Sequence, residues 1–116
     1  MFVKETKGDV LIEIVNIERA TLIYADEFRH ILLKDIEDGW RKIIIDLTAN
    51  SFMDSSFLGS IVIALKTISK LGGDLRIAAA HGDSHAVLEL TGTSRVLKAF
   101  NTCEEAVLSF KDKKIV

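Results

Sequence analysis

The sequence predicts an α/β fold, a single domain in which about four helices cover a mixed sheet of four to five strands. Short runs rich in β-branched residues alternate along the chain with amphipathic helical patterns, an order typical of a partly parallel sheet. The 116 residues suit one domain, and they contain neither proline nor a low-complexity linker that would divide the chain. We therefore expect residues 1–116 to form one unit, with a solvated C-terminal tail at 110–116.

The first elements are a hairpin and a long helix. Residues 2–6 and 10–15 flank Lys7-Gly8-Asp9, where glycine supplies the turn dihedrals, so they predict a β-hairpin. From Thr21 onward the apolar residues recur at steps of three and four, which predicts an amphipathic helix. Thr21 is its expected N-cap, and Gly39 is its expected end.

The rest of the chain repeats strands and helices at short intervals. A continuous apolar run at 42–47 predicts a strand buried on both faces. Residues 54–71 carry the clearest helical pattern, and Gly72-Gly73 ends it. The remaining expected elements are a buried strand at 74–79 and helices at 84–90 and 102–110.

Charge and cysteine content exclude several classes of function. Fifteen Lys and Arg against seventeen Asp and Glu give a net charge of −2, which offers no broad attraction for nucleic acid or an anionic membrane. No apolar run approaches the ~20 residues that a membrane span needs, and the start lacks a signal-peptide pattern. The lone Cys103 fits a reducing cytosol. We expect a cytoplasmic protein that neither binds nucleic acid directly nor inserts into a membrane.

Residue patterns typical of enzymes or metal centres are sparse. The sequence has no phosphate-binding loop, dinucleotide fingerprint or nucleophile elbow. His81 and His85 are four residues apart, but no third or fourth soft ligand lies nearby, so we expect no metal and no cofactor. A hydrolase with Ser55 or Ser56 as nucleophile would need a histidine base, and the histidines, including His30, belong to other elements. We therefore expect no catalytic residues.

The most informative segment is 50–59, which leaves a buried strand and enters a helix. Its hydroxyl groups lie at the helix start, where free backbone N–H groups and the helix dipole favour an anion. A phosphate on Ser55 could accept those N–H bonds. Asp54, Ser55 and Ser56 are also ordinary capping residues, and from the residues alone capping is the simpler explanation.

Residues 42–73 resemble the centre of the STAS domain, the fold of bacterial anti-sigma-factor antagonists. The matching pieces are Ile43-Ile44-Ile45-Asp46-Leu47, Ser51-Phe52-Met53-Asp54-Ser55-Ser56-Phe57-Leu58-Gly59 and Leu71-Gly72-Gly73. In that family the serine directly after the motif's aspartate is phosphorylated by a partner anti-sigma factor that is a serine kinase. The resemblance therefore implies that Ser55 is a phosphorylation site, and that Asp54, Ser56 and Gly59 contact the partner.

The sequence departs from the family pattern at two places. Phe57 replaces the first glycine of the motif. The acidic stretch that the family has before the first long helix is replaced by Glu18-Arg19-Ala20-Thr21, although Thr21 can still cap that helix. A step of about 100° per residue places Phe57 at the margin of the apolar arc, partly available to solvent, and Ile63 beside Ser60 on the polar side. We therefore add Thr21, Phe57 and Ile63 to the expected partner contacts. The arc expected on the sheet comprises Leu58, Ile61, Val62, Leu65 and Ile68.

The resemblance implies a phosphorylation-controlled binding module. Unphosphorylated protein would sequester a serine-kinase anti-sigma factor of the GHKL type and thereby free a sigma factor. A phosphate on Ser55 would bring about −1.5 to −2 charges into that interface, and a serine phosphatase would remove it. The alternative is a STAS-like scaffold subunit of a stress-sensing complex or of a lipid-transport ATPase, in which the ring of Phe57 would suit a permanent interface.

Overall fold

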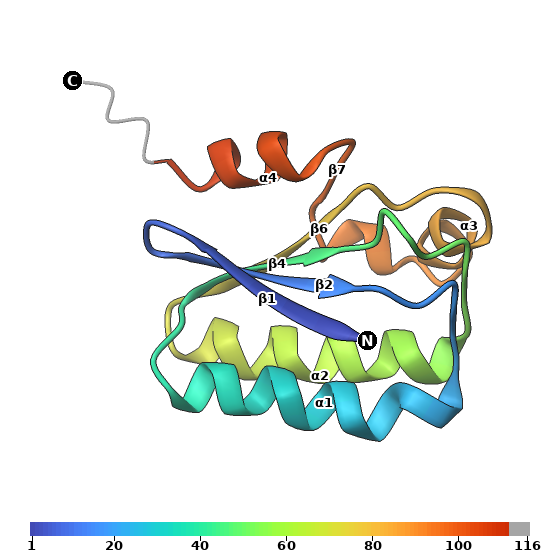
Figure 1. Cartoon of the computed structure of the whole chain (residues 1–116), viewed down its shortest axis with the longest axis horizontal. Coiled ribbons are helices and arrows are strands. Elements are labelled where there is room, and N and C mark those ends of the chain that lie inside the picture. The colour runs from blue at the N-terminus through green and yellow to red at the C-terminus, as the bar shows by residue number, and fades with distance from the viewer. Residues whose placement is uncertain (112–116) are drawn as a thin grey trace.

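A mixed five-stranded sheet runs through the middle of the molecule (Figure 1). The computed structural model describes residues 1–111, so the expected tail lies outside the described residues from residue 112 on. In spatial order the strands are β1 (Phe2–Lys7), β2 (Val10–Val15), β4 (Lys42–Asp46), β6 (Asp74–Ala78) and β7 (Ala99–Phe100). Strands β1 and β2 form the predicted antiparallel hairpin, and the other neighbouring pairs are parallel. The predicted α/β class with a mixed sheet is confirmed.

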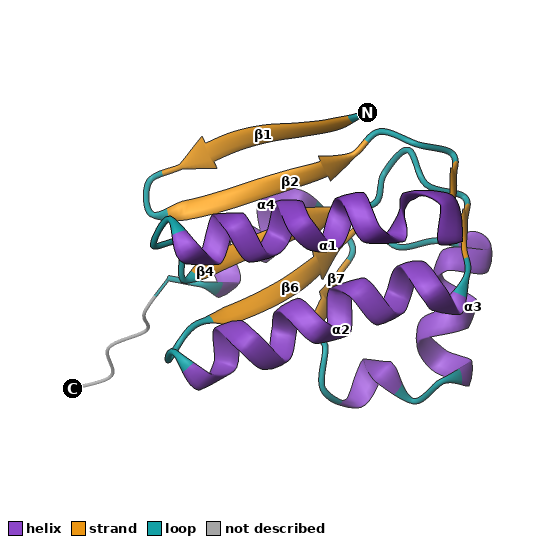
Figure 2. Ribbon diagram, turned by 90° about the horizontal axis from the view of Figure 1, so that it is seen from below, coloured by secondary structure: helices purple, strands orange, loops and turns teal. Residues whose placement is uncertain are grey.

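The helices cover the two faces of the sheet unequally. Helices α1 (Leu22–Glu37) and α2 (Ser55–Lys70) lie side by side on one face, and the short helix α4 (Cys103–Ser109) lies on the other (Figure 1, Figure 2). Helix α3 (Gly82–Leu90) lies where the parallel strands end, and the 3-10 turn η1 (Thr93–Arg95) follows it. Helix α3 begins two residues earlier than expected. Within the described part of the chain, no helix has the length and apolarity that a membrane span requires.

Three strands of only two residues each were not predicted. Strand β7 extends the main sheet, whereas β3 (Arg19–Ala20) and β5 (Phe52–Met53) form a separate parallel pair. The chain enters α1 shortly after β3 and α2 shortly after β5. This small pair therefore fixes the two helix starts beside each other.

The main core lies between the sheet and the helix pair α1 and α2, and a stack of aromatic rings is part of it. The Phe28 ring stacks on Phe2 with centroids 4.8 Å apart and on Phe57 with centroids 4.9 Å apart. Phe28 and Phe57 are fully buried, and Phe2 brings the first strand onto the same stack. A smaller apolar cluster lies under α4 on the opposite face of the sheet.

Two expectations about the exposure of α2 are wrong. Phe57 is fully buried and does not face solvent, and Ser60 is also buried instead of lying on the polar side. The Ser60 hydroxyl donates a hydrogen bond of 2.6 Å to the carbonyl oxygen of Ala25 in α1. The physical reason is that α2 packs against both the sheet and α1, so its buried arc is wider than that of a helix on a sheet alone.

A cluster of charged side chains interrupts the apolar face of the sheet. Glu13 on β2 is 0% exposed, and Asp35 on α1 is also buried. The Lys4 ammonium on β1 donates to Oε2 of Glu13 and, at 2.8 Å, to Oδ1 of Asp35. Burial raises the pKa of Glu13 to about 8, and the neighbouring Asp35 carboxyl adds to this rise while Lys4 opposes it. The Glu13 carboxyl therefore keeps its proton at neutral pH.

Candidate partner-binding site

The candidate site is the corner of the molecule where α1 and α2 begin. Asp54 is the N-cap residue of α2, and its Oδ1 atom accepts a hydrogen bond of 2.9 Å from the Phe57 N–H. Its Oδ2 atom accepts one of 2.8 Å from the Leu22 N–H, at the start of α1. One carboxylate thus caps both helices and holds their starts together. Thr21 occupies the predicted N-cap position of α1, but its side chain makes no capping hydrogen bond, which Asp54 supplies instead.

Ser55 and Ser56 form the exposed beginning of α2. Backbone N–H groups in the first turn have no acceptor inside a helix, and the Asp54 carboxylate occupies that of Phe57. The N–H groups of the two serines remain at the positive end of the helix dipole, where an anion is favoured. The predicted position of Ser55 at a helix start is confirmed.

A buried amide that the sequence did not single out supports the loops around this corner. The Asn50 side chain donates to the carbonyl oxygens of Ile17, Glu18 and Phe52, at 3.2, 3.3 and 2.9 Å. The Ser84 hydroxyl, buried at the start of α3, donates in turn to the Asn50 side-chain oxygen. These bonds join three segments that are far apart in the sequence, and no local pattern marks them. A polar residue between a strand and a helix is the only signal that sequence reading could have used.

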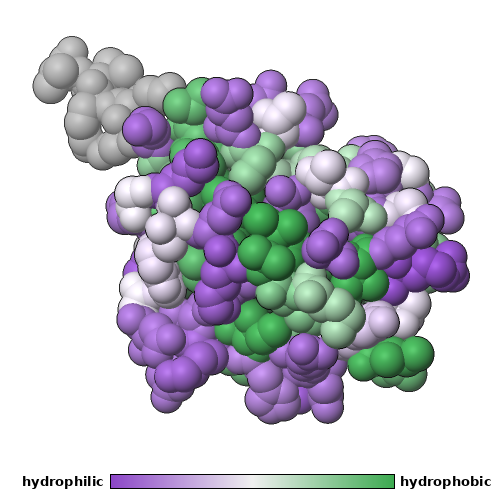
Figure 3. All heavy atoms as spheres, in the orientation of Figure 1, coloured by the Kyte–Doolittle hydropathy of each residue, from purple (hydrophilic) through white to green (hydrophobic). Residues whose placement is uncertain are grey.

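Apolar side chains are exposed next to the serines. Leu22 and Ile23, the first two residues of α1, are 68% and 82% exposed. In Figure 3, hydrophobic side chains project at the corner of the molecule where α1 begins. Exposed apolar groups of this kind are typical of surfaces that bind a protein partner. Their sequence positions carry no local signal, because single apolar residues are common on the exposed side of a helix.

The other expected contacts are dispersed. Phe57 is inside the core and cannot reach a partner in this conformation. Gly59 lies one turn into α2, and a Cβ atom added there would meet nothing within 4 Å. Ile63 is 44% exposed, as expected, but lies eight residues beyond Ser55, about 12 Å along the helix axis. The structure therefore gathers Thr21, Asp54 and the two serines at one corner and leaves Ile63 outside it.

Aromatic and imidazole groups around the corner make local contacts. The Arg19 guanidinium lies over the Phe52 ring, 4.2 Å from its centroid, which strengthens the pairing of β3 with β5. The His81 Nε2 atom lies 3.0 Å from the Thr48 carbonyl oxygen, within hydrogen-bond distance. Among residues 1–111, no three His, Cys, Asp or Glu side chains are placed to hold a metal ion. The arrangement can bind a protein surface and accept an anion at Ser55.

The fold and this corner define a class: a small α/β domain that presents serines at a helix start beside exposed apolar residues. The chain matches the STAS domain over residues 4–106, and it belongs to the STAS domain family. The resemblance seen in the sequence is thereby confirmed.

Known proteins of this family include anti-sigma factor antagonists. A Thermotoga maritima protein that is provisionally named an anti-sigma factor antagonist is 34% identical over 99 residues, which are 85% of this chain and 84% of that protein. A crystal structure of such a protein from Thermotoga maritima has a TM-score of 0.87 at 29% identity and covers 93% of this chain and 92% of that one. The Bacillus cell fate determinant SpoIIAA, solved in its phosphorylated form, shares the fold with a TM-score of 0.74 at 18% identity, covering 96% of this chain and 100% of that one.

Proposed function

We propose that the protein is an anti-sigma factor antagonist whose binding is switched by phosphorylation of Ser55. The observation that carries the proposal is the position of Ser55, exposed at the start of α2 and directly after an aspartate that caps two helices. Two comparisons support it. The relatives described above carry the name anti-sigma factor antagonist, and SpoIIAA has been solved in a phosphorylated form.

In the unphosphorylated state the corner offers exposed apolar side chains beside uncharged hydroxyl groups. Leu22 and Ile23 supply apolar contact area, and the serine hydroxyls beside them supply hydrogen-bonding groups. The proposed occupant is an anti-sigma factor that is also a serine kinase of the GHKL type. Its sequestration here would free a sigma factor.

Phosphorylation would change the charge of this surface without changing the fold. A phosphate on Ser55 would add about −1.5 to −2 charges beside the Asp54 carboxylate. Asp54 is held by two backbone N–H groups and cannot turn away without uncapping a helix. Repulsion and desolvation of the two anions would weaken the complex by roughly 3–4 kcal/mol, or more than a hundredfold in affinity. A serine phosphatase would restore binding.

The proposal is tested with the partner kinase. The protein is incubated with its anti-sigma factor and ATP, and the phosphorylated residue is mapped by mass spectrometry. We expect modification of Ser55, its loss in Ser55→Ala and its retention in Ser56→Ala. Undiminished modification of Ser55→Ala would exclude Ser55 as the site. Ser55→Asp should weaken the complex, and an unchanged affinity would contradict the charge mechanism.

The scaffold alternative loses the observation that favoured it. That alternative relied on an exposed ring at Phe57, and Phe57 is buried in the aromatic stack. The exposed apolar side chains at the start of α1 suit a reversible contact as well as a permanent one. We therefore retain the switch as the proposed function.

A further inference from the structure

A second exposed surface, which we call the α2 groove, lies away from the serines. It is a hollow of about 400 Å³ between α2 and the chain just after η1. Val62, Leu65 and Val96 form its apolar floor, and Val96 is 63% exposed. Lys66 and Lys70 stand on its rim, one helical turn apart. The groove therefore combines an accessible apolar floor with positive charge along one side.

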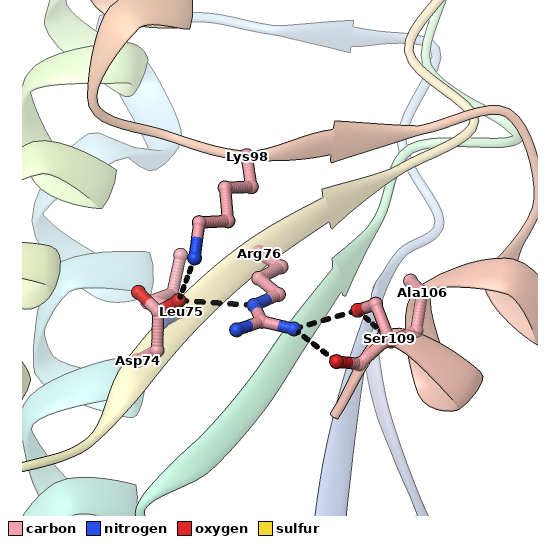
Figure 4. Close-up of polar contacts among 6 residues, drawn as sticks. All are labelled: Asp74, Leu75, Arg76, Lys98, Ala106 and Ser109. Carbon is pink, nitrogen blue, oxygen red and sulfur yellow. Dashed lines mark hydrogen bonds and ion pairs between the residues drawn. The ribbon is translucent and has the colours of Figure 1, made fainter. Parts of the chain in front are cut away.

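The positive charge of the α2 groove is not neutralised from within. Among residues 1–111, neither Lys66 nor Lys70 forms an ion pair. The one acidic lining residue is Asp74, whose Oδ2 atom accepts from Arg76 at 2.9 Å and lies 3.7 Å from the Lys98 ammonium (Figure 4). Its Oδ1 atom accepts from a backbone N–H. Asp74 is thus occupied by other cations, and the two rim lysines keep their charge in a chain whose net charge is −2.

The shape and charge of the α2 groove select one kind of occupant. From Val62 to Lys70 the helix rises about 12 Å, which matches about two turns of a bound helix. A helix that binds here would contact the apolar floor with apolar residues at helical spacing, and its Asp or Glu residues would pair with the two lysines. We propose that the α2 groove docks an acidic amphipathic helical segment of a partner protein.

This contact would be independent of the serine switch. Lys66 lies eleven residues beyond Ser55, about 16 Å along the helix axis. That separation exceeds the screening length of about 8 Å at physiological salt, so a charge at Ser55 acts only weakly on the α2 groove. A partner could then remain attached here whether or not Ser55 is phosphorylated.

The test uses a synthetic helical peptide as the probe. The peptide carries leucines at helical spacing and glutamates at the other positions, and it is titrated into the isotope-labelled full chain at physiological salt with detection by NMR. We expect amide shifts confined to the α2 groove and about tenfold weaker binding by Lys66→Glu/Lys70→Glu, because both rim charges are reversed. Lys7→Glu/Lys111→Glu, at two exposed lysines that form no ion pair among residues 1–111, is the control with the same change in net charge and should bind like the wild type. Ser55→Asp should bind within about twofold of the wild type.

Other outcomes would overturn the proposal. These are shifts on another face, equal binding by Lys66→Glu/Lys70→Glu, or equal binding of a peptide with lysines in place of the glutamates. If sedimentation shows a dimer of the wild type and a monomer of Val96→Glu, the groove binds a second copy of the chain. Binding to anionic phosphatidylglycerol vesicles in place of the peptide would assign it to a lipid surface. If the double variant fails to fold, Val96→Ala serves as a second test, because it removes apolar area from the floor without changing the charge. Unchanged peptide binding by Val96→Ala would then contradict the proposal.

Discussion

The buried Glu13 carboxyl makes the stability of this protein depend on pH in an unusual direction. Glu13 is fully buried and has a pKa of about 8 in the folded protein, against 4.5 for an ordinary glutamate. The folded protein therefore retains a proton that the unfolded chain releases above about pH 4.5. The stabilisation linked to this proton is complete below pH 4.5 and is lost as the pH rises to about 8. We expect the free energy of unfolding to fall across this interval.

The size of the effect follows from the interval between the two pKa values. One proton gives a slope of at most about 1.4 kcal/mol per pH unit, and the interval from 4.5 to about 8 corresponds to a total on the order of 4–5 kcal/mol. Glu13→Gln imitates the protonated carboxyl and leaves Asp35 paired with Lys4. This variant should lose the slope and be more stable than the wild type at pH 8, but not at pH 5.

The assay is urea unfolding followed by far-ultraviolet circular dichroism at unit steps from pH 5 to pH 9. Asp35→Asn should reduce the slope, because the Asp35 carboxyl contributes to the raised pKa of Glu13. Glu5→Gln, on an exposed residue of the same hairpin, is the matched control and should keep the wild-type slope. A wild-type stability that is constant or rises from pH 5 to pH 8 would refute the reasoning, and so would a full slope in Glu13→Gln.

Three further predictions concern the helix pair, and each is measured by urea unfolding at constant pH. Asp54→Ala removes the caps of both helices and should lower the free energy of unfolding by about 1–3 kcal/mol. Thr21→Ala should be nearly neutral, because the Thr21 side chain makes no capping bond. Equal losses in the two variants would contradict the shared cap. Phe57→Ala opens a cavity in the aromatic stack and should cost about 3–5 kcal/mol, against a few tenths for the exposed Ile63→Ala. Gly59→Ala adds a methyl group where no atom lies within 4 Å, and alanine favours a helix more than glycine does, so the protein should be stabilised by up to about 1 kcal/mol. Destabilisation would contradict the open space around Gly59.

Sequence periodicity was sufficient for the long elements and insufficient for contacts between them. The four longer strands and four helices each carry a local pattern, and each was predicted. The two-residue strands β3, β5 and β7 carry no period, because their pairing partners lie far away in the sequence. The position of Phe57 was misjudged for a related reason: a helical wheel assumes one covering surface, and α1 supplies a second one.

The candidate site shows the same division. Ser55 was placed correctly because a helix start is a local feature of the sequence. Thr21 was also placed correctly at the N-cap position of α1, but the capping hydrogen bond comes from Asp54, 32 positions away from Leu22. The bond between Asn50 and Ser84 spans 34 positions and is equally invisible to local rules. Long-range hydrogen bonds of buried side chains thus determine how the site is held, while local patterns determine where it lies.

A charge at Ser55 should weaken binding while leaving the stability of the fold nearly unchanged, and this separates the proposed switch from simple damage to the fold. In Ser55→Asp the carboxylate stands in the first turn of α2, where the helix dipole stabilises an anion by about 0.3–1 kcal/mol. The Asp54 carboxylate close by opposes this gain, so we expect a net change in unfolding free energy within about 0.5 kcal/mol. Affinity for the anti-sigma factor should nevertheless fall by more than tenfold, because the partner must cover two neighbouring carboxylates. Urea unfolding and titration calorimetry on one preparation measure both quantities, with Ser55→Asn as the uncharged control. Equal losses of affinity in the Asp and Asn variants would attribute the effect to shape and exclude charge as the signal.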